Sequence, residues 1–289
     1  NTDVVGEYID DLPMCLNEPE KLIESLAPML KITGGPTEQI LGINVTQQDN
    51  EIRVFAGKNI MESVKKQGLE EAKKKFVPGT QVIDESTENV DQKIYRSLVG
   101  SCMHPALYCR PDVSHAVRYC SQFSHCANKS ALKAAKKILK YLLHTKDDYL
   151  VFRGNMELMG YVDADYANDK TDRRSVTGYI FFLGESPISW KSKKQTLVTL
   201  STTEAEYIAI SEAVQEGKYL RGLLNELGFP QKTTKLYNDN LSAVRICNNQ
   251  DATFDRTKHI DVKFRFVKEA LIELEFELLH CGTEENRAD

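Results

Sequence analysis

The stretch Leu158-Met159-Gly160-Tyr161-Val162-Asp163 opens the part of the chain with the clearest structural pattern. It is an apolar run that ends in a carboxylate, which is typical of a buried strand. Three strands in close succession, followed by strands that alternate with helices, predict an α/β domain built on a mixed sheet. After this first strand, the pattern predicts strands at 176–183, 186–191, 234–239 and 274–279, helices at about 203–227, 241–249 and 260–270, and a final helical start at Glu284.

Four carboxylates in this half occupy positions where a strand or a helix would present them. Asp163 and Asp239 end predicted strands, Glu206 lies in the first turn of a predicted helix, and Asp289 is the last residue of the sequence. If the fold brings these acids together, their mutual repulsion must be offset, and a divalent cation is the ordinary means. The pattern therefore predicts metal-assisted phosphodiester chemistry.

Two glutamates compete for the helix position in Ser201-Thr202-Thr203-Glu204-Ala205-Glu206, because both fit capping boxes. Helical periodicity separates them. The residues three, four and seven positions after Glu206 are all apolar, whereas the same offsets from Glu204 include Ser211. Glu206 therefore leans toward the buried side, where an unpaired carboxylate is costly. We assign Glu206 to the metal site and Glu204 to the cap or the surface.

The remaining acids have structural alternatives. Asp165 shares a face with Asp163 if the strand continues, but Asp163 ends the apolar run and is the better candidate. Asp239 or the following Asn240 could instead cap the next helix. Asp289, taken alone, fits an ordinary surface position.

Basic residues gather in two segments. Lys191, Lys193 and Lys194 follow Trp190, a combination that suits a phosphate backbone with a stacking aromatic ring nearby. The helix predicted at about 129–144 has a lysine-rich face, which fits either binding of a nucleic-acid backbone or an ordinary solvated surface. Its predicted apolar stripe is Leu132, Ala135, Leu139 and Leu142, and its lysines are Lys129, Lys133, Lys136, Lys137 and Lys140.

The composition is that of an ordinary soluble globular protein, with 289 residues of which 41% are hydrophobic and 27% charged. No apolar run approaches the ~18–20 residues that cross a membrane, so no membrane partner is expected. With a net charge of −5, a nucleic-acid-binding protein must concentrate its lysines and arginines locally. The seven cysteines form no CxxC pair and predict reduced thiols in an intracellular protein. The start has no basic segment followed by an apolar one, so no signal peptide is expected. It also lacks a methionine, which predicts a piece of a longer translation product.

The first half of the chain has a different organisation. Residues 58–76 have a helical, lysine-rich composition, and the polar stretch 77–92 is a predicted linker. Residues 93–145 are helical in pattern. Pro105 and Pro111 interrupt that pattern, so at least three helices fit.

A series of segments in the second half resembles the RNase H domain of copia-type LTR retrotransposons. Such a series in the right order is highly specific. The segments are Gly160-Tyr161-Val162-Asp163-Ala164-Asp165-Tyr166-Ala167, Arg174-Ser175-Val176-Thr177-Gly178-Tyr179, Ile188-Ser189-Trp190-Lys191-Ser192-Lys193-Lys194-Gln195, Leu200-Ser201-Thr202-Thr203-Glu204-Ala205-Glu206-Tyr207, Tyr237-Asn238-Asp239-Asn240, Arg256-Thr257-Lys258-His259-Ile260-Asp261 and Glu285-Asn286-Arg287-Ala288-Asp289.

The first half resembles the reverse transcriptase of the same elements. Tyr8-Ile9-Asp10-Asp11 is similar to the polymerase signature, and Leu41-Gly42-Ile43 and Tyr95-Arg96-Ser97-Leu98-Val99-Gly100 are similar to later segments. The resemblance implies that Asp10 and Asp11 are two of three polymerase metal ligands, the third lying upstream of Asn1. We therefore expect no template-dependent synthesis from this chain alone, which a primer-extension assay would check.

The resemblance implies an RNase H that hydrolyses the RNA strand of RNA–DNA hybrids with Mg²⁺ or Mn²⁺. The implied metal ligands are Asp163, Glu206, Asp239 and Asp289, and because no sequence follows Asp289 we expect it to be the weakest of the four. The expected substrate-binding residues are Trp190, Lys191, Lys193, Lys194, Lys258 and His259.

The expected fold class is α/β, with an α+β palm, thumb and connection remnant before an RNase H-like mixed five-stranded sheet with flanking helices. The expected domains are a reverse transcriptase palm remnant at 1–50, a thumb/connection-like helical region at 51–154 and an RNase H-like domain at 155–289. The expected partners are an RNA–DNA hybrid and the upstream remainder of the Pol polyprotein, in the cytoplasm (a virus-like particle) or the nucleus. The alternative is a catalytically inactive nucleic-acid-binding or structural remnant of a decayed or host-recruited element.

Overall fold

The chain forms two compact units in a computed structural model. The first comprises Asn1–Arg110 and Cys120–Val151, and the second comprises Pro111–Tyr119 and Phe152–Asp289. The structure describes residues 4–5, 14–15, 19–28, 38–48, 50–79, 83–84, 87–167, 172–249 and 258–289, with backbone only at 4, 14, 19, 26 and 258–261.

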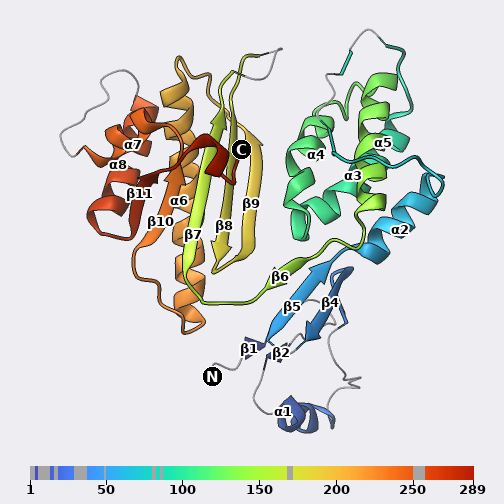
Figure 1. The fold of residues 1–289 in the computed structure, drawn as a ribbon, viewed down its shortest axis with the longest axis horizontal. Helices are drawn as coiled ribbons and strands as arrows, with labels where there is room; N and C mark the ends of the chain where they lie inside the picture. The colour runs from blue at the N-terminus through green and yellow to red at the C-terminus, as the bar shows by residue number, and fades with distance from the viewer. Residues whose placement is uncertain are drawn as a thin grey trace. The chain divides into compact units, whose positions relative to one another are not determined.

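The first unit combines two small sheets with a group of helices (Figure 1). Strands β1 (Val4–Val5) and β2 (Met14–Cys15) pair antiparallel, and a second sheet has the order β3-β4-β5-β6. The strands of the second sheet are β3 (Gln39–Ile40), β4 (Ile43–Gln48), β5 (Glu51–Phe55) and β6 (Leu150–Phe152). The helices of the first unit are α1 (Pro19–Leu26), α2 (Gly57–Lys66), α3 (Gln92–Tyr108) and α5 (Lys129–His144). The 3₁₀ turn η1 (Pro111–Val113) and all but the last two residues of α4 (Ser114–Ser121) belong to the second unit.

Two helices of the first unit differ from the sequence-based expectation. The helix expected at 58–76 ends at Lys66, because Gly68 adopts a left-handed backbone (φ 61°) that closes a helix readily. Pro105 does not end a helix, since α3 continues to Tyr108 and its last turn closes with a hydrogen bond from the Cys109 N–H to the Pro105 carbonyl. Pro105 is buried, so packing offsets the loss of the backbone donor that proline lacks.

Helix α5 packs against α2 and α3 and begins where the Asn128 side chain accepts a hydrogen bond from the Ala131 N–H (2.8 Å). The expected apolar stripe was wrong at one position, because Leu132 is partly exposed and lies among the lysines. The buried face of α5 consists of Ala131, Ala134, Ala135, Ile138, Leu139, Leu142 and Leu143.

The second unit is built on a five-stranded sheet of order β11-β10-β7-β8-β9 (Figure 1). Strands β7, β8 and β9 pair antiparallel, whereas β10 runs parallel to both β7 and β11. This confirms the predicted mixed sheet. The strands are β7 (Leu158–Asp165), β8 (Val176–Leu183), β9 (Ser186–Lys194), β10 (Thr234–Asn238) and β11 (Phe276–His280), and the helices are α6 (Thr202–Glu226), α7 (Leu241–Asn248) and α8 (Lys258–Ile272).

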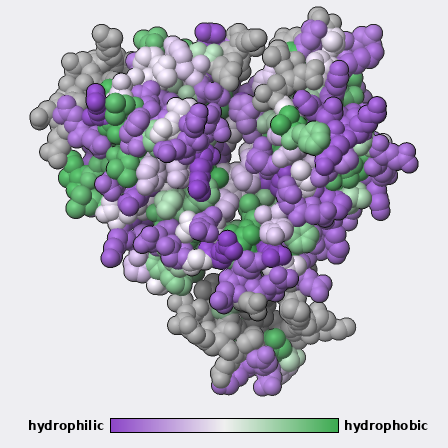
Figure 2. Space-filling model, in the orientation of Figure 1, coloured by the Kyte–Doolittle hydropathy of each residue, from purple (hydrophilic) through white to green (hydrophobic). Residues whose placement is uncertain are grey.

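Helix α6 covers one face of this sheet through contacts with β7 and β8, and α8 packs against α6. The core between them contains Val162, Phe181, Ile210, Leu236 and Phe276, all nearly inaccessible to solvent. The helical start expected at Glu284 is instead a single 3₁₀ turn, η2 (Thr283–Glu285). Figure 2 shows that hydrophilic residues cover much of the face in view, and among the described residues no helix is long and apolar enough to cross a membrane.

Candidate active site

Three acids converge near the ends of two neighbouring parallel strands. Asp163 lies two residues before the end of β7, and Asp239 directly follows β10. Asn238 of β10 is in register with Val162 of β7. Each of these two residues is followed by an aspartate, Asp239 and Asp163 respectively. Glu206 reaches the same place from α6, and oxygen atoms of the three carboxylates lie within 4.8 Å of one another.

The structure separates the roles of the two glutamates in the first turns of α6. The Ser201 hydroxyl accepts a hydrogen bond from the Glu204 N–H (3.2 Å), and the Glu204 carboxylate accepts one from the Leu200 N–H (2.7 Å). Glu204 is therefore part of the helix N-terminus, as expected. Glu206 is only 3% exposed and faces the other two acids.

Burial and mutual repulsion raise the pKa values of two acids in the cluster. Loss of hydration is the main reason that the pKa of Glu206 rises to about 8, with Asp163 and Asp239 adding to the rise. A hydrogen bond donated by Asn238 opposes it. Burial likewise raises the pKa of Asp163 to about 6, with contributions from Asp239 and Asp289.

The donor set fits a hard divalent cation. Within the part of the chain that the structure describes, no salt bridge joins Asp163, Glu206 or Asp239 to a lysine or arginine. The cluster consequently gathers carboxylate oxygens without a protein counter-charge, which is the ligand chemistry that Mg²⁺ and Mn²⁺ prefer.

We expect the metal-free protein to lose stability as the pH rises from about 4 to 8. Folding raises the pKa values of Asp163 and Glu206 from 3.8 and 4.5 to about 6 and about 8, so the folded state holds these protons more tightly than the unfolded chain. The stability they contribute is present at low pH and is lost as the pH rises through the folded values. Thermal melting in EDTA should show a decline of several degrees, at about 2–4 °C per kcal/mol.

Two controls isolate this effect of the acid cluster. A Glu206→Gln variant cannot titrate at this position and should lack the part of the decline between about pH 6 and 8. Saturating Mg²⁺ should also remove most of the decline in the wild-type protein. A wild-type melting temperature that declines no more than that of Glu206→Gln would contradict the assignment.

The fourth candidate acid, Asp289, is exposed and lies outside the set of three converging carboxylates. It contributes to the raised pKa of Asp163, and both residues line one hollow together with Trp190 and Lys191. The backbone of its segment passes directly over β8. A Cβ atom on Gly178 would lie 2.9 Å from the Ala288 carbonyl oxygen, so glycine at this position admits the segment.

The other expected site residues have mixed placements. Lys193 forms a salt bridge with Glu212 (3.6 Å) and Lys194 one with Asp172 (2.9 Å), whereas Lys191 is exposed. The side chains of Lys258 and His259 lie outside the described residues, as do Asp10 and Asp11.

Three residues that support the acids were not anticipated from the sequence. They are Asn238, Asn286 and Gly178, which contact the acids or the segments that carry them. Only their positions beside the acids in the sequence could have suggested them, because isolated asparagines and glycines are more often turn or cap residues.

The chain is similar to transposon polyproteins. No protein-family model matches it. It is 35% identical over 303 residues to the retrovirus-related Pol polyprotein from transposon TNT 1-94 of Nicotiana tabacum, covering 98% of this chain and 22% of that protein. It is 32% identical over 293 residues to the corresponding polyprotein from transposon RE1 of Arabidopsis thaliana, covering 98% of this chain and 20% of that protein.

A solved structure resembles the fold over nearly the whole chain. The foamy viral protease-reverse transcriptase, solved in complex with an RNA/DNA hybrid, covers 96% of this chain and 36% of its own, with a TM-score of 0.56. Its sequence is 13% identical, so the likeness concerns the fold alone.

The mixed sheet of order β11-β10-β7-β8-β9, with helices packed on it and an acidic cluster where β7 and β10 end, defines the second unit as an RNase H-like domain. The chain as a whole belongs to the retrovirus-related Pol polyproteins of copia-type transposons, as a fragment of the reverse transcriptase/RNase H type. It spans about a fifth of the length of the curated relatives it matches.

Proposed function

We propose that the second unit hydrolyses the RNA strand of RNA–DNA hybrids. The observation that carries this proposal is the convergence of Asp163, Glu206 and Asp239 in an RNase H-like fold, without a protein counter-charge among the described residues. The proposed setting is intracellular, in a cytoplasmic virus-like particle or the nucleus, as part of a longer Pol polyprotein.

The residues of the site have distinct proposed roles. Asp163 would serve two Mg²⁺ or Mn²⁺ ions, Glu206 and Asp239 would share one of them, and Asp289 would serve the other. Bound metal would supply an activated water and stabilise the leaving 3′ oxygen. The exposed Lys191 and the indole of Trp190 contact the backbone and a base of the hybrid from the hollow that they share with Asp163. In the first unit, Asp10 and Asp11 remain proposed as polymerase metal ligands.

A comparison of three labelled duplexes tests this function directly. With Mg²⁺, the chain should cut the RNA strand of an RNA–DNA hybrid, and it should leave the matching DNA duplex and RNA duplex intact. EDTA should stop the reaction. Binding of the hybrid without cleavage at any Mg²⁺ or Mn²⁺ concentration would favour the alternative function, a catalytically inactive nucleic-acid-binding remnant.

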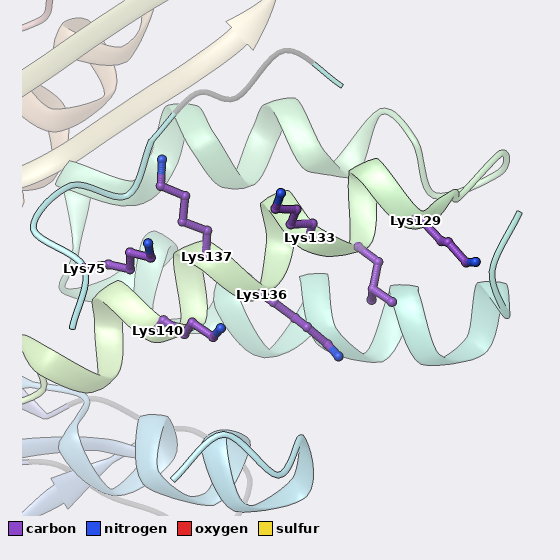
Figure 3. A pocket seen from close by; sticks show the side chains of 7 residues that line it. Lys75, Lys129, Lys133, Lys136, Lys137 and Lys140 are labelled. Carbon is purple, nitrogen blue, oxygen red and sulfur yellow. The ribbon is translucent and has the colours of Figure 1, made fainter. Parts of the chain in front are cut away.

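A second proposed contact with nucleic acid is a lysine groove in the first unit (Figure 3). The five α5 lysines from Lys129 to Lys140 and the nearby Lys75 line it together with Leu132. Lys129 to Lys140 spans about 16 Å at ~1.5 Å per residue. That length matches several phosphates at ~3.4 Å of duplex axis per strand position, so a nucleic-acid backbone fits the groove better than a small anion does.

Removing three charges from the lysine groove should weaken hybrid binding without altering the chemistry. We expect Lys133→Gln/Lys136→Gln/Lys140→Gln to lower the dependence of log K on log salt by up to about 3, at ~0.9 per phosphate contact. Fluorescence anisotropy in EDTA measures this binding independently of cleavage. The charge-matched control is Lys93→Gln/Lys232→Gln/Lys235→Gln, at three exposed lysines outside the groove. If both triple variants change the salt dependence of hybrid binding equally, the groove lysines contribute only general positive charge, and the groove is not a specific binding site.

A further inference from the structure

Two buried asparagine amides converge on one backbone oxygen beside the acidic cluster. The Nδ2 groups of Asn238 and Asn286 donate hydrogen bonds to the Val162 carbonyl oxygen, at 3.0 Å and 3.1 Å. Val162 directly precedes Asp163 in β7, and Asn238 directly precedes Asp239. One carbonyl therefore links the backbone segments that carry three of the candidate acids: Asp163, Asp239 and Asp289.

Asn238 also binds the remaining candidate acid, Glu206. Its Nδ2 donates to Glu206 Oε2 at 2.9 Å, and its Oδ1 accepts from the Asn240 N–H at 3.1 Å. Because a backbone N–H must face the amide oxygen, the orientation of the amide is set and its NH₂ group must face Glu206 and Val162. Asn238 is fully buried, and its hydrogen-bonding groups all have partners.

Asn286 organises the segment that carries Asp289. Its Oδ1 accepts a hydrogen bond from the Ala288 N–H at 3.1 Å, while its Nδ2 holds the segment to β7. The next residue adds a second attachment, since the Arg287 guanidinium lies over the rings of Tyr161 (5.6 Å) and Phe182 (5.0 Å). The segment is thus attached at Asn286 and at Arg287 before it reaches Asp289.

We propose that Asn238 and Asn286 are positioning residues that hold the four acids in register through the Val162 carbonyl, ready for a divalent cation. This inference rests on the proposed function of the same site. Like-charged carboxylates repel one another, so a cluster without its cation tends to spread. Neutral amide donors oppose this spreading without neutralising the ligands, whereas a lysine in their place would compete with the metal.

Metal binding in the absence of nucleic acid tests the proposal. Mg²⁺ and Mn²⁺ titrations by calorimetry should show binding about 10–100-fold weaker for Asn238→Leu, the range typical of residues that orient metal ligands. Asn286→Leu should weaken binding as well, and Asn286→Gln, which keeps the amide, should restore part of it. In hybrid cleavage, both leucine variants should need more Mg²⁺, while KM for the hybrid stays close to the wild-type value.

Asn248, the last residue of helix α7, provides a control beside the same sheet. Its Nδ2 donates to the Leu278 carbonyl of β11 at 3.1 Å, away from the acids. Asn248→Ala should lower the melting temperature without changing the metal-binding midpoint. The proposal is overturned if both leucine variants bind metal like the wild type, or if Asn248→Ala weakens binding equally.

Further outcomes separate this proposal from the proposed function. If Asn238→Leu fails to fold, the Asn286 variants decide, because they alter one segment at the sheet surface. A wild-type chain that binds metal but does not cleave hybrids would contradict the RNase H function and leave the positioning role to be judged by calorimetry. A wild-type chain that binds neither metal would overturn both.

Discussion

Replacing Asp163 with asparagine should lower the rate of hybrid cleavage at least about 10³-fold while leaving the protein folded. Asp163 is the proposed ligand of both metal ions, and metal ions supply several kcal/mol of transition-state stabilisation at ~1.36 kcal/mol per factor of ten. The substitution keeps the shape of the side chain and removes its charge. Single-turnover cleavage at saturating Mg²⁺ measures the loss, and anisotropy in EDTA should show unchanged hybrid binding.

Asp165 supplies the matched control for this variant. It lies two residues further along β7, on the same face of the sheet, and lines the same hollow as Asp163. Asp165 is outside the set of three converging carboxylates. We therefore expect Asp165→Asn to retain cleavage within about tenfold of wild type. If the two variants lose activity equally, Asp163 has no special role, and the assignment of the metal site is wrong.

Replacing Glu206 with glutamine should also lower cleavage strongly, by about 10²–10³-fold at saturating Mg²⁺. The glutamine fits the same buried space and can still accept the hydrogen bond from Asn238, but it offers a metal only a neutral oxygen. Because burial raises the pKa of Glu206 to about 8, the metal-free wild type already carries a proton there at pH 7. In the unfolded chain the same carboxyl is ionised at pH 7, so the substitution should already stabilise the metal-free protein at pH 7 and should stabilise it somewhat more at pH 9.

Glu204 tests whether position rather than charge matters in this helix. Glu204→Gln removes the same charge two residues earlier, from a side chain that accepts a hydrogen bond from the Leu200 N–H. We expect cleavage close to the wild-type rate and a loss of stability no greater than about 1 kcal/mol, as for helix caps. Comparable losses of activity in both glutamine variants would show that the helical offsets misassigned the two residues.

Much of the RNase H-like fold was predictable because local patterns record burial. Apolar runs at 158–163 and 176–183 identified β7 and β8, since nearly all side chains of these two strands are buried or partly buried, on both faces of the sheet. In a helix the pattern repeats every 3.6 residues. The apolar residues three, four and seven positions after Glu206 therefore indicated that Glu206 lies on the buried face. The structure does place Glu206 beside Asp163 and Asp239.

Local patterns were misleading where packing from elsewhere outweighed them. Pro105 remained inside α3 because the helix is buried around it, and Leu132 remained on the lysine side of α5 because α2 and α3 cover the opposite face. The segment that begins near Glu284 forms only a single 3₁₀ turn and no longer helix. Its Asn286 side chain instead donates a hydrogen bond to the Val162 carbonyl.

The sequence by itself determined the class of sheet, the order of its strands and helices along the chain, and which acids were candidates for a metal site. Only the tertiary structure decided which acids meet and what holds them together. The Val162 carbonyl accepts hydrogen bonds from side chains 76 and 124 residues further along the chain, and Gly178 leaves room for the Ala288 backbone. Periodicity reports on neighbours within a turn or a strand, whereas such contacts depend on the spatial order of the strands, which no local period records.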